Sequence, residues 1–297
     1  MTINIAIVPV AGLGTSVLPL TKSQPKEMLA VGRKPVVQYV VEELARSGIE
    51  RILFITSHGK SSIEAHFDID EQLIQYLRET GREQNLAELE YERHQIEYFY
   101  TRQRRQLGLG HAVLCAQPLI GKEPAVVALG DSIIGRNGDS QIVQRMIAAF
   151  DSEKADAVIA IEEVAADQVN QFGMVTARDP AAELLTLTGA VEKPEVHPSA
   201  GNLSIAARYV FSSAVYDALH RVKPDGQGMI QLTDAIDLLI QDGAKVIGLK
   251  LGQQTQRYDI GGFESYFKTF LDFALTDPEF GATLRNHVQQ VLDGSEG

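Results

Sequence analysis

Cysteine, long apolar runs and positive charge are all scarce in this sequence of 297 residues. The single cysteine, Cys115, permits no disulfide within the chain, and without paired cysteines or clustered histidines there is no zinc or iron–sulfur signature. No segment approaches the roughly 18 consecutive apolar residues of a membrane span, which argues against a membrane protein. No basic region or small-residue cleavage site precedes the first apolar run, so we expect a cytoplasmic protein.

Acidic residues outnumber lysine and arginine by 39 to 27, which gives a formal net charge of −12. Broad binding of nucleic acid is therefore excluded, because it needs a basic face to neutralise phosphates. An anionic small molecule is still compatible with a locally basic pocket. A required metal would be a hard cation held by carboxylates and phosphates, and Mg²⁺ is the first expectation.

Apolar runs of β type alternate with helical patterns along the chain. The runs are 3–10, 51–56, 125–129, 156–162, 205–211 and 245–250, and the helical patterns lie near 35–47, 60–67, 109–116, 140–150, 213–221 and 232–241. This alternation predicts an α/β protein with a mostly parallel sheet and helices on both faces.

Two helical segments stand apart from this alternation. The polar segment 68–95 predicts a helical arm beside the sheet, either a lid or an interface. The aromatic segment 264–297 has helical spacing, and we expect it to pack on the core, with oligomerisation as the alternative. The predicted organisation is a main domain over 1–263 and a C-terminal helical segment over 264–297.

The most informative segment, A-G-L-G-T-S-V-L-P-L-T-K-S-Q-P-K, spans residues 11–26 and follows the first apolar run. Gly12 and Gly14 lack the Cβ atom that would keep an anion away from backbone N–H groups, so the loop can wrap a polyphosphate. A tight surface turn is the alternative. A dinucleotide-binding fingerprint fits poorly, because Val17 occupies the place of its third glycine.

Gly59-Lys60-Ser61 resembles the end of another phosphate-binding motif, the P-loop. Phe54 occupies the position of that motif's first glycine, so the tripeptide predicts an ordinary turn that opens a helix.

Two aspartates follow apolar strand regions. Asp131 occurs in V-V-A-L-G-D-S and Asp259 in R-Y-D-I-G-G. Ligands of open α/β sheets bind at the carboxyl ends of the strands, although an aspartate there is often only a helix cap. Two carboxylates that converge at this edge would hold Mg²⁺ together with phosphate oxygens.

Two further fragments offer polar groups. Glu192 and Lys193, in V-E-K-P, place a carboxylate for hydroxyls next to an ammonium group for a phosphate, with a solvated turn as the alternative. Gln103 carries an amide able to pair with a pyrimidine edge, and it precedes the turn from Gly108 to His111. His111 by itself is expected to form a hydrogen bond at a helix entry.

Together these fragments resemble one family, the bacterial UTP–glucose-1-phosphate uridylyltransferases (UDP-glucose pyrophosphorylases), within the sugar-1-phosphate nucleotidyltransferases. In the family's order, over about residues 3–275, the matching segments are A-G-L-G-T, L-T-K-S-Q-P-K-E-M-L, K-P-V-V-Q-Y-V-V-E-E, L-G-L-G-H-A-V-L-C-A, L-G-D, F-G-M-V, V-E-K-P, I-Q-L-T-D-A-I and R-Y-D-I-G. The resemblance implies a Rossmann-like nucleotidyltransferase fold, a homodimer or homotetramer, and the conversion of UTP and glucose 1-phosphate to UDP-glucose and pyrophosphate.

The resemblance also implies roles for individual residues. Nucleotide binding would involve Ala11, Gly12 and Gly14 in the loop, with Gln103 and Gly108 at the uracil. Lys26 would bind phosphate, and Asp131 and Asp259 would hold Mg²⁺. The sugar would be held by Gly173, Glu192 and Lys193, with the last of these at its phosphate. Lys26, Asp131 and Lys193 are thus the expected catalytic residues.

Three positions depart from the family pattern. Ser16 replaces an arginine, Ser132 stands where a second aspartate is common, and Met229 where glutamate is common. One hypothesis is a working enzyme in which Arg104 or Arg105 compensates for the missing arginine. The alternative is a weakly active or inactive regulatory paralogue that binds sugar nucleotide.

Overall fold

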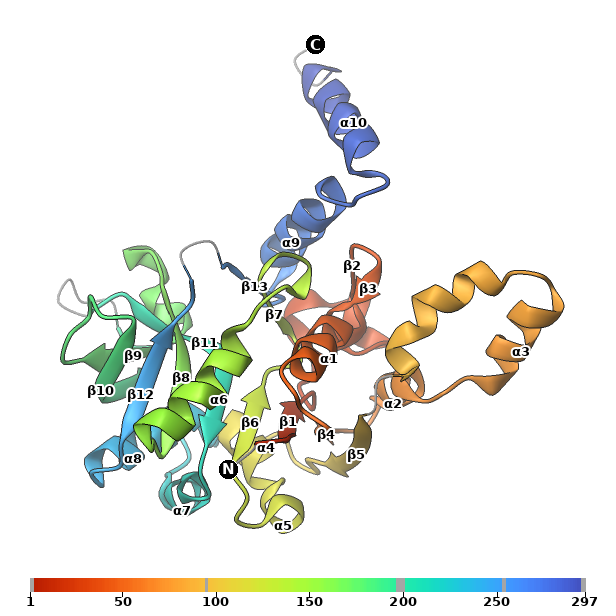
Figure 1. Cartoon of the computed structure of the whole chain (residues 1–297). Coiled ribbons are helices and arrows are strands. Elements are labelled where there is room, and N and C mark those ends of the chain that lie inside the picture. Colours follow the sequence, from red (N-terminus) through yellow and green to blue (C-terminus); the bar gives the residue numbers. More distant parts are fainter. Residues whose placement is uncertain (1–2, 94–95, 196–200, 253–254, 295–297) are drawn as a thin grey trace.

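A nine-stranded mixed sheet forms the centre of the computed structural model, which describes residues 3–93, 96–195, 201–252 and 255–294 (Figure 1). In spatial order the strands are β5 (Glu97–Arg102), β4 (Arg51–Thr56), β1 (Ile5–Pro9), β6 (Ala125–Ala128), β11 (Leu203–Phe211), β8 (Ala157–Glu163), β12 (Val246–Lys250), β10 (Leu184–Glu192) and β9 (Gly173–Ala177).

The strands β5, β4, β1 and β6 are parallel neighbours, as are β8 and β12. Strands β10 and β11 run against their neighbours, and β9 also touches β11 through Met174 and Ser204. A mixed sheet is therefore confirmed. The expectation of a mostly parallel sheet is correct for strands β5, β4, β1 and β6. In the rest of the sheet most pairs are antiparallel, because β10 and β11 run against their neighbours.

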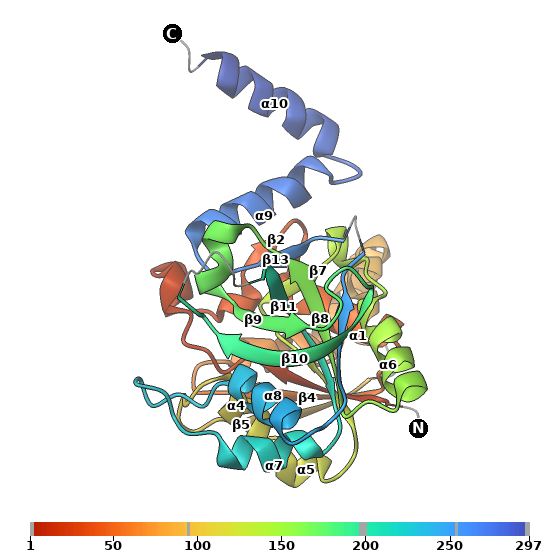
Figure 2. The same ribbon diagram turned by 90° about the vertical axis from the view of Figure 1, so that its left-hand side faces the viewer.

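Helices cover both faces of this sheet, as the alternation of apolar segments predicted (Figure 2). One face carries α4 (Leu109–Leu114), α5 (Gln117–Ile120), α7 (Ala214–Arg221) and α8 (Leu232–Gln241); the other carries α1 (Val36–Arg46), α2 (Ser61–Phe67) and α6 (Ile142–Glu153). Successive side chains of a strand point to opposite faces. Accordingly, Ile5 and Ile7 of β1 enter the first core cluster, and Ala6 and Val8 enter the second.

Short elements connect these layers. They are β2 (Ala30–Val31), β3 (Lys34–Pro35), β7 (Ser132–Ile134), β13 (Arg257–Asp259) and the 3₁₀ helices η1 (Thr15–Val17), η2 (Leu20–Lys22), η3 (Lys26–Met28), η5 (Arg136–Gly138) and η6 (Ala166–Gln171). Strand β13 pairs with β7 in a small separate sheet. A third apolar cluster lies under this sheet and holds it against α1.

The segment 68–93 projects to one side of the sheet (Figure 1). It contains α3 (Glu71–Glu79) and the 3₁₀ helix η4 (Glu83–Arg93), and Asp70 caps α3 by accepting from the Leu73 backbone N–H at 2.9 Å. Its expected last residues, 94–95, lie outside the described residues. The arm is helical as predicted, and its role as a lid or an interface stays a prediction.

The C-terminal segment forms α9 (Phe263–Leu275) and α10 (Gly281–Gly294). Phe273 of α9 packs edge-on against Tyr39 and Tyr258, with ring centroids 5.3 and 5.1 Å apart. Helix α10 extends away from the body of the molecule in both views (Figures 1 and 2). The expectation that this whole segment packs on the core is therefore correct for α9 and wrong for α10, whose side chains are mostly exposed; residues 295–297 lie outside the described part of the chain. None of the described helices is both long enough and apolar enough to span a membrane.

Candidate functional site

The glycine loop begins where β1 ends and forms one wall of a cavity of about 450 Å³. Gly14 has a φ of +67°, in the left-handed region that favours glycine. A Cβ atom on Gly12 would meet no atom within 4 Å, so the backbone at this residue is open to the cavity. The loop therefore combines a turn that needs glycine with main chain that a ligand can approach closely.

Strand order explains why distant segments meet at this cavity. Strands β5, β1 and β6 all run in the same direction, so the residues that follow them emerge at the same edge of the sheet. Gln103 follows β5, Ala11 follows β1 and Asp131 follows β6, and all three line the cavity. The predicted site residues in its wall are Ala11, Gly12, Gly14, Lys26, Gln103, Gly108 and Asp131.

Lys26 and Asp131 form an ion pair in the cavity wall, with Nζ 2.6 Å from Oδ2. Burial lowers the pKa of Lys26, but the charge and hydrogen bond of Asp131 outweigh it and hold the pKa above its ordinary value. Burial likewise raises the pKa of Asp131, and Lys26 reverses this effect, so the net shift is downward. Both groups are therefore charged at neutral pH and present a cation and an anion to the cavity.

Asp259 is brought beside Asp131 by the small sheet. In this sheet Asp259 lies opposite Ser132, and the Ile260 backbone N–H donates to the Asp131 carbonyl oxygen at 3.1 Å. Burial and then the charge of Asp131 raise the pKa of Asp259 to about 6. Two carboxylates that repel one another in this way suit a divalent cation, although Asp259 itself does not line the cavity. Among the described residues no group of three or more metal-ligating side chains occurs, so other ligands would have to come from substrate or water.

Glu192, Lys193 and Gly173 meet in a second group outside the cavity wall. Strand pairing sets Glu192 opposite Gly173, and Thr233 Oγ1 donates to Glu192 Oε2 at 2.6 Å. A Cβ atom on Gly173 would lie 2.6 Å from Thr233 Oγ1 and 3.1 Å from Glu192 Oε2. Lys193 has a φ of +41°, and its backbone N–H donates to the Phe172 carbonyl oxygen at 3.1 Å. The structure therefore brings the three predicted sugar-site residues together.

Arg257 connects the two groups, a role that the reasoning from sequence missed. Its Nε atom donates to Glu162 Oε1 at 2.5 Å, and its guanidinium lies 4.6 Å from the ring centroid of Phe172. Phe172 precedes Gly173, and Arg257 lies two residues before Asp259 on β13. The charge of Arg257 also lowers the pKa of Asp259, although burial and Asp131 have the larger effect. The only local indication in the sequence is that Arg257 stands two residues before Asp259 in the segment R-Y-D.

At the far end of the cavity, Gln103 is 4% exposed and donates from Nε2 to the Gly108 carbonyl oxygen at 3.0 Å. Gly108 has a φ of +93°, and a Cβ atom there would lie 2.6 Å from the Ile230 carbonyl oxygen. Glycine is thus required both by the backbone angle and by the close approach of the 229–231 segment. Met229, from the same segment, completes this end of the wall.

The three departures from the family pattern have different surroundings. Ser16 lies exposed in η1, Met229 lines the cavity, and Ser132 is fully buried, with no hydrogen-bond partner for Oγ within the described residues. Arg104 and Arg105 are exposed, and Gln106 rather than either arginine reaches the cavity wall. Compensation for the missing arginine by Arg104 or Arg105 stays a prediction without a contact to support it.

The turn Gly59–Ser61 opens α2, as the sequence predicted. Lys60 is buried and its Nζ atom donates to Glu27 Oε2 at 2.7 Å. Burial raises the pKa of Glu27, and Lys60 opposes that shift. Glu27 lies next to Lys26 and also lines the cavity, so this buried pair fixes the segment that carries Lys26.

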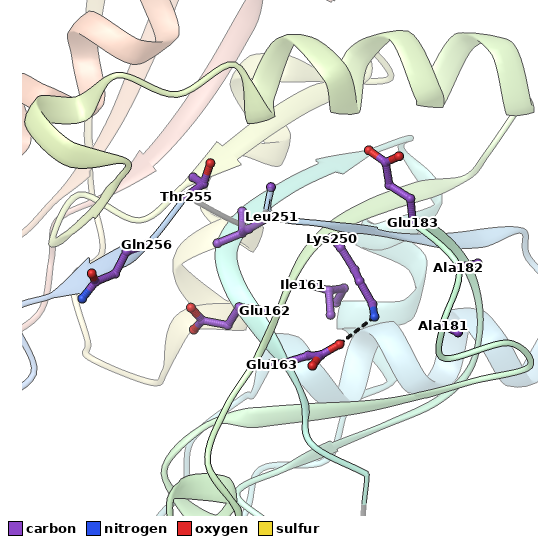
Figure 3. Close-up of a pocket in the computed structure, with 11 residues that line it drawn as sticks. Ile161, Glu162, Glu163, Ala181, Ala182, Glu183, Lys250, Leu251, Thr255 and Gln256 are labelled. Carbon is purple, nitrogen blue, oxygen red and sulfur yellow. Dashed lines mark hydrogen bonds and ion pairs between the residues drawn. The ribbon is translucent and has the colours of Figure 1, made fainter.

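A larger cavity, of about 780 Å³, lies beside the ends of β8 and β12 (Figure 3). Its charged lining residues form ion pairs. Glu163 pairs with Lys250 at 2.7 Å, Glu162 with Arg257, and Glu183 with Arg145. The carboxylates of the smaller cavity are paired as well, but there Lys26 lies beside the open main chain of Gly12, so the cavity at the glycine loop is the better place for an anionic ligand.

This edge of the sheet offers three groups to a phosphate: the open main chain at Gly12, the ammonium group of Lys26, and the neighbouring carboxylates of Asp131 and Asp259, which could hold a shared cation. That combination belongs to α/β proteins that transfer nucleotidyl groups. A family model described as "Nucleotidyl transferase" matches residues 5–275.

Relatives and solved structures match over nearly the whole chain. A protein of Staphylococcus saprophyticus named UTP–glucose-1-phosphate uridylyltransferase 1 is 37% identical, over 98% of this chain and 99% of its own. A UTP-bound UGPase from Acinetobacter baumannii is 36% identical with a TM-score of 0.87, over 97% and 99% of the two chains. A UDP-glucose pyrophosphorylase complexed with UDP-glucose is 30% identical with a TM-score of 0.79, over 91% and 97%. The chain belongs to the UTP–glucose-1-phosphate uridylyltransferase family of nucleotidyl transferases.

Proposed function

We propose that this protein transfers the uridylyl group of UTP to glucose 1-phosphate and releases pyrophosphate. The observation that carries the proposal is the Lys26–Asp131 pair at the glycine-loop cavity, in a chain that matches named uridylyltransferases from end to end. The full-length match to proteins with bound UTP and bound UDP-glucose supports the same two ligands here. The resemblance favours this enzyme over the alternative regulatory paralogue.

Each end of the site has a proposed ligand. The main chain at Ala11, Gly12 and Gly14 would face the triphosphate, and Gln103 with Gly108 would hold the uracil. Lys26 would bind phosphate oxygens. The group of Gly173, Glu192 and Lys193 would hold the glucose hydroxyls and the sugar phosphate, because it offers a carboxylate acceptor and an ammonium group together.

The reaction needs no protein nucleophile. A phosphate oxygen of glucose 1-phosphate attacks the α-phosphorus of UTP, a P–O bond forms, and the bond from that phosphorus to the pyrophosphate oxygen breaks. Lys26 and Lys193 stabilise the negative charge that spreads over the phosphate oxygens, and the loop holds the reactants in line. Catalysis is therefore positioning and electrostatic stabilisation.

Asp131 and Asp259 are the residues that would hold Mg²⁺. The proximity of the two residues supports this assignment, as does the pKa of Asp259, which is raised by burial and by the neighbouring charge of Asp131. When bound, the ion would neutralise phosphate oxygens and polarise the α-phosphorus. In this structure Asp131 pairs with the ammonium group of Lys26.

Assembly and compartment are further parts of the proposal. We propose a homodimer or homotetramer that uses the C-terminal segment, because Phe267, Phe270 and Leu271 of α9 are 60%, 42% and 45% exposed. The arm at 68–93 is the second candidate surface. The cytoplasm remains the predicted compartment.

A coupled assay of pyrophosphate release tests the proposed reaction directly. The purified protein is incubated with UTP, glucose 1-phosphate and Mg²⁺, and then with each reactant left out. We expect release only when all are present. Measurable binding of UDP-glucose without any turnover at high protein concentration would instead support the regulatory paralogue.

A further inference from the structure

The Gln103 side chain is held by two hydrogen-bond acceptors. Its Nε2 atom lies 3.0 Å from the Gly108 carbonyl oxygen and 3.0 Å from His111 Nδ1. A backbone carbonyl oxygen can only accept, so the atom of Gln103 that faces Gly108 must be the amide nitrogen. The orientation of the amide therefore follows from its surroundings.

The two contacts use both hydrogens of the amide group. An amide nitrogen has two hydrogens, and here one goes to Gly108 and the other to His111. What Gln103 can still offer is its carbonyl oxygen, Oε1, and Gln103 is part of the cavity wall. A ligand in the cavity can consequently bind this side chain only by donating a hydrogen to it.

His111 must accept at Nδ1 for this arrangement to hold. Burial lowers the pKa of His111, which favours the neutral ring. Cys115 Sγ lies 3.8 Å from the same nitrogen, and a thiol reaches an unprotonated nitrogen as a donor. The amide nitrogen of Gln103 can only donate, so Nδ1 accepts from it and the ring proton belongs on Nε2.

We propose that His111 is a positioning residue that occupies the second amide hydrogen of Gln103 and so makes this site select a nucleobase with an imide N–H. Uracil and thymine have a hydrogen on N3, whereas cytosine has a lone pair there. The N3 lone pair of cytosine would face Oε1 acceptor to acceptor. The inference rests on the proposed function, because it assumes that the base lies at Gln103.

Matched variants separate this role from simple support of the fold. His111→Leu removes the acceptor, while His111→Asn has nearly the same shape and keeps an acceptor oxygen near the place of Nδ1. In His111→Leu the second amide hydrogen becomes available to the N3 lone pair of cytosine. We expect the ratio of kcat/KM for UTP to that for CTP to fall about tenfold, the effect of one hydrogen bond. His111→Asn should keep the wild-type ratio.

The experiment measures kcat and KM for UTP, dTTP and CTP with glucose 1-phosphate for the wild type and each variant. Values for dTTP should follow those for UTP, because both bases carry N3–H. A ratio that is unchanged in His111→Leu, or that falls equally in His111→Asn, overturns the proposal, even if turnover itself drops. His111→Phe keeps an aromatic ring without an acceptor and replaces the leucine variant if that protein does not fold.

Failure of the proposed function has a different result. In that case the wild type makes no UDP-glucose. The inference is then tested by calorimetry, which compares the affinities of the same proteins for UTP and CTP. A preference for UTP that weakens only in His111→Leu supports it. Absence of any preference in the wild type, or of binding by either nucleotide, overturns it.

Discussion

Arg208 and Glu43 form an ion pair in which Nη2 lies 2.7 Å from Oε2 and the two side chains are 0% and 1% exposed. Arg208 also donates to the Ser132 carbonyl oxygen at 2.9 Å. Ser132 follows Asp131, so this buried pair ties helix α1 and strand β11 to the segment that carries the proposed metal ligand. The pair is a structural support for the site and does not line its cavity.

Removal of one partner should destabilise the protein strongly. Glu43→Gln leaves the Arg208 charge buried without its counter-ion, so we expect the free energy of unfolding to fall by about 3–5 kcal/mol. Urea unfolding followed by circular dichroism measures this value. Glu264→Gln is the matched control, because Glu264 belongs to an exposed pair with Lys268 and its loss should change little. Equal stability of the two variants would show that the buried charge is compensated elsewhere.

Lys26→Met should abolish most of the turnover. The methionine keeps the length of the side chain and removes the charge that faces the phosphates, so we expect kcat to fall by about 10²–10³-fold. The measurement is pyrophosphate release at saturating UTP and glucose 1-phosphate. Lys122→Met, at an exposed lysine outside the cavity wall, serves as the control and should retain wild-type kcat. A kcat for Lys26→Met close to that of the control would remove Lys26 from the mechanism.

The burial of Asp259 and its repulsion by Asp131 should make stability depend on pH. The pKa of Asp259 is about 6 in the folded protein, above its ordinary value of 3.8. The folded state therefore binds more protons between these values, and this aspartate destabilises the protein as pH rises from about 4 to about 6. We expect Asp259→Asn to raise the melting temperature at pH 8 and to leave it nearly unchanged at pH 3.5.

Added Mg²⁺ provides the second half of that test. An ion held by both carboxylates stabilises the folded state by mass action, so it should raise the Tm of the wild type at pH 8 more than that of Asp259→Asn. The variant should also lose Mg²⁺-dependent turnover. If Mg²⁺ shifts both proteins equally, the ion binds somewhere other than this pair.

Gly173→Ala should affect the sugar and spare the nucleotide. The added Cβ would lie 2.6 Å from Thr233 Oγ1 and 3.1 Å from Glu192 Oε2, so Thr233 must shift and its hydrogen bond to the Glu192 carboxylate is disturbed. We expect a higher KM for glucose 1-phosphate and an unchanged KM for UTP, measured in the same assay. Gly226→Ala, where a Cβ meets nothing within 4 Å, is the control. An increase in KM for UTP alone would move Gly173 to the nucleotide end of the site.

Ser16→Arg tests whether the missing arginine limits the enzyme. A regained charged hydrogen bond is worth about 1.5–3 kcal/mol, so kcat/KM for UTP should rise by about tenfold or more. Arg105→Ala should change this constant little, because Arg105 is exposed and outside the cavity wall. A large loss in Arg105→Ala, together with no gain in Ser16→Arg, would establish compensation by Arg105.

Local pattern was sufficient for most of the elements and for the loop cavity. Alternating apolar segments predicted strands and covering helices, because each of these elements buries an apolar face. The edge of the sheet at which parallel strands end could be inferred from the order of the segments. Ala11 and Asp131 follow two of the predicted strands and line one cavity, whereas Gln103 follows β5, which was not among the predicted strands, so that only the family resemblance placed it at this site. The same reasoning overestimated parallel pairing, since strand direction in β10 and β11 leaves no mark on apolar periodicity.

Contacts between distant segments were beyond local reasoning. Glu43 and Arg208 are 165 residues apart, and each looks like an ordinary charged residue in its own helix or strand. Arg257 likewise gains its role from Glu162 and Phe172, which reach it only when β13 joins β7. Because these side chains are buried, each charge needs its partner: a buried charge without a counter-ion costs free energy.

The sequence by itself determined the α/β class, the glycine loop after the first strand, and the set of lysines and carboxylates that the family resemblance assigns to phosphate, sugar and metal. Those features depend on periodicity and residue type, which are local properties. Only the tertiary structure decided which hydrogens of Gln103 are occupied, because that depends on the Gly108 carbonyl and His111 Nδ1 both approaching to 3.0 Å. Hydrogen bonds are directional and act over a short distance, so the packing of the loop, rather than the order of residues, determines which polar atoms Gln103 leaves for a ligand.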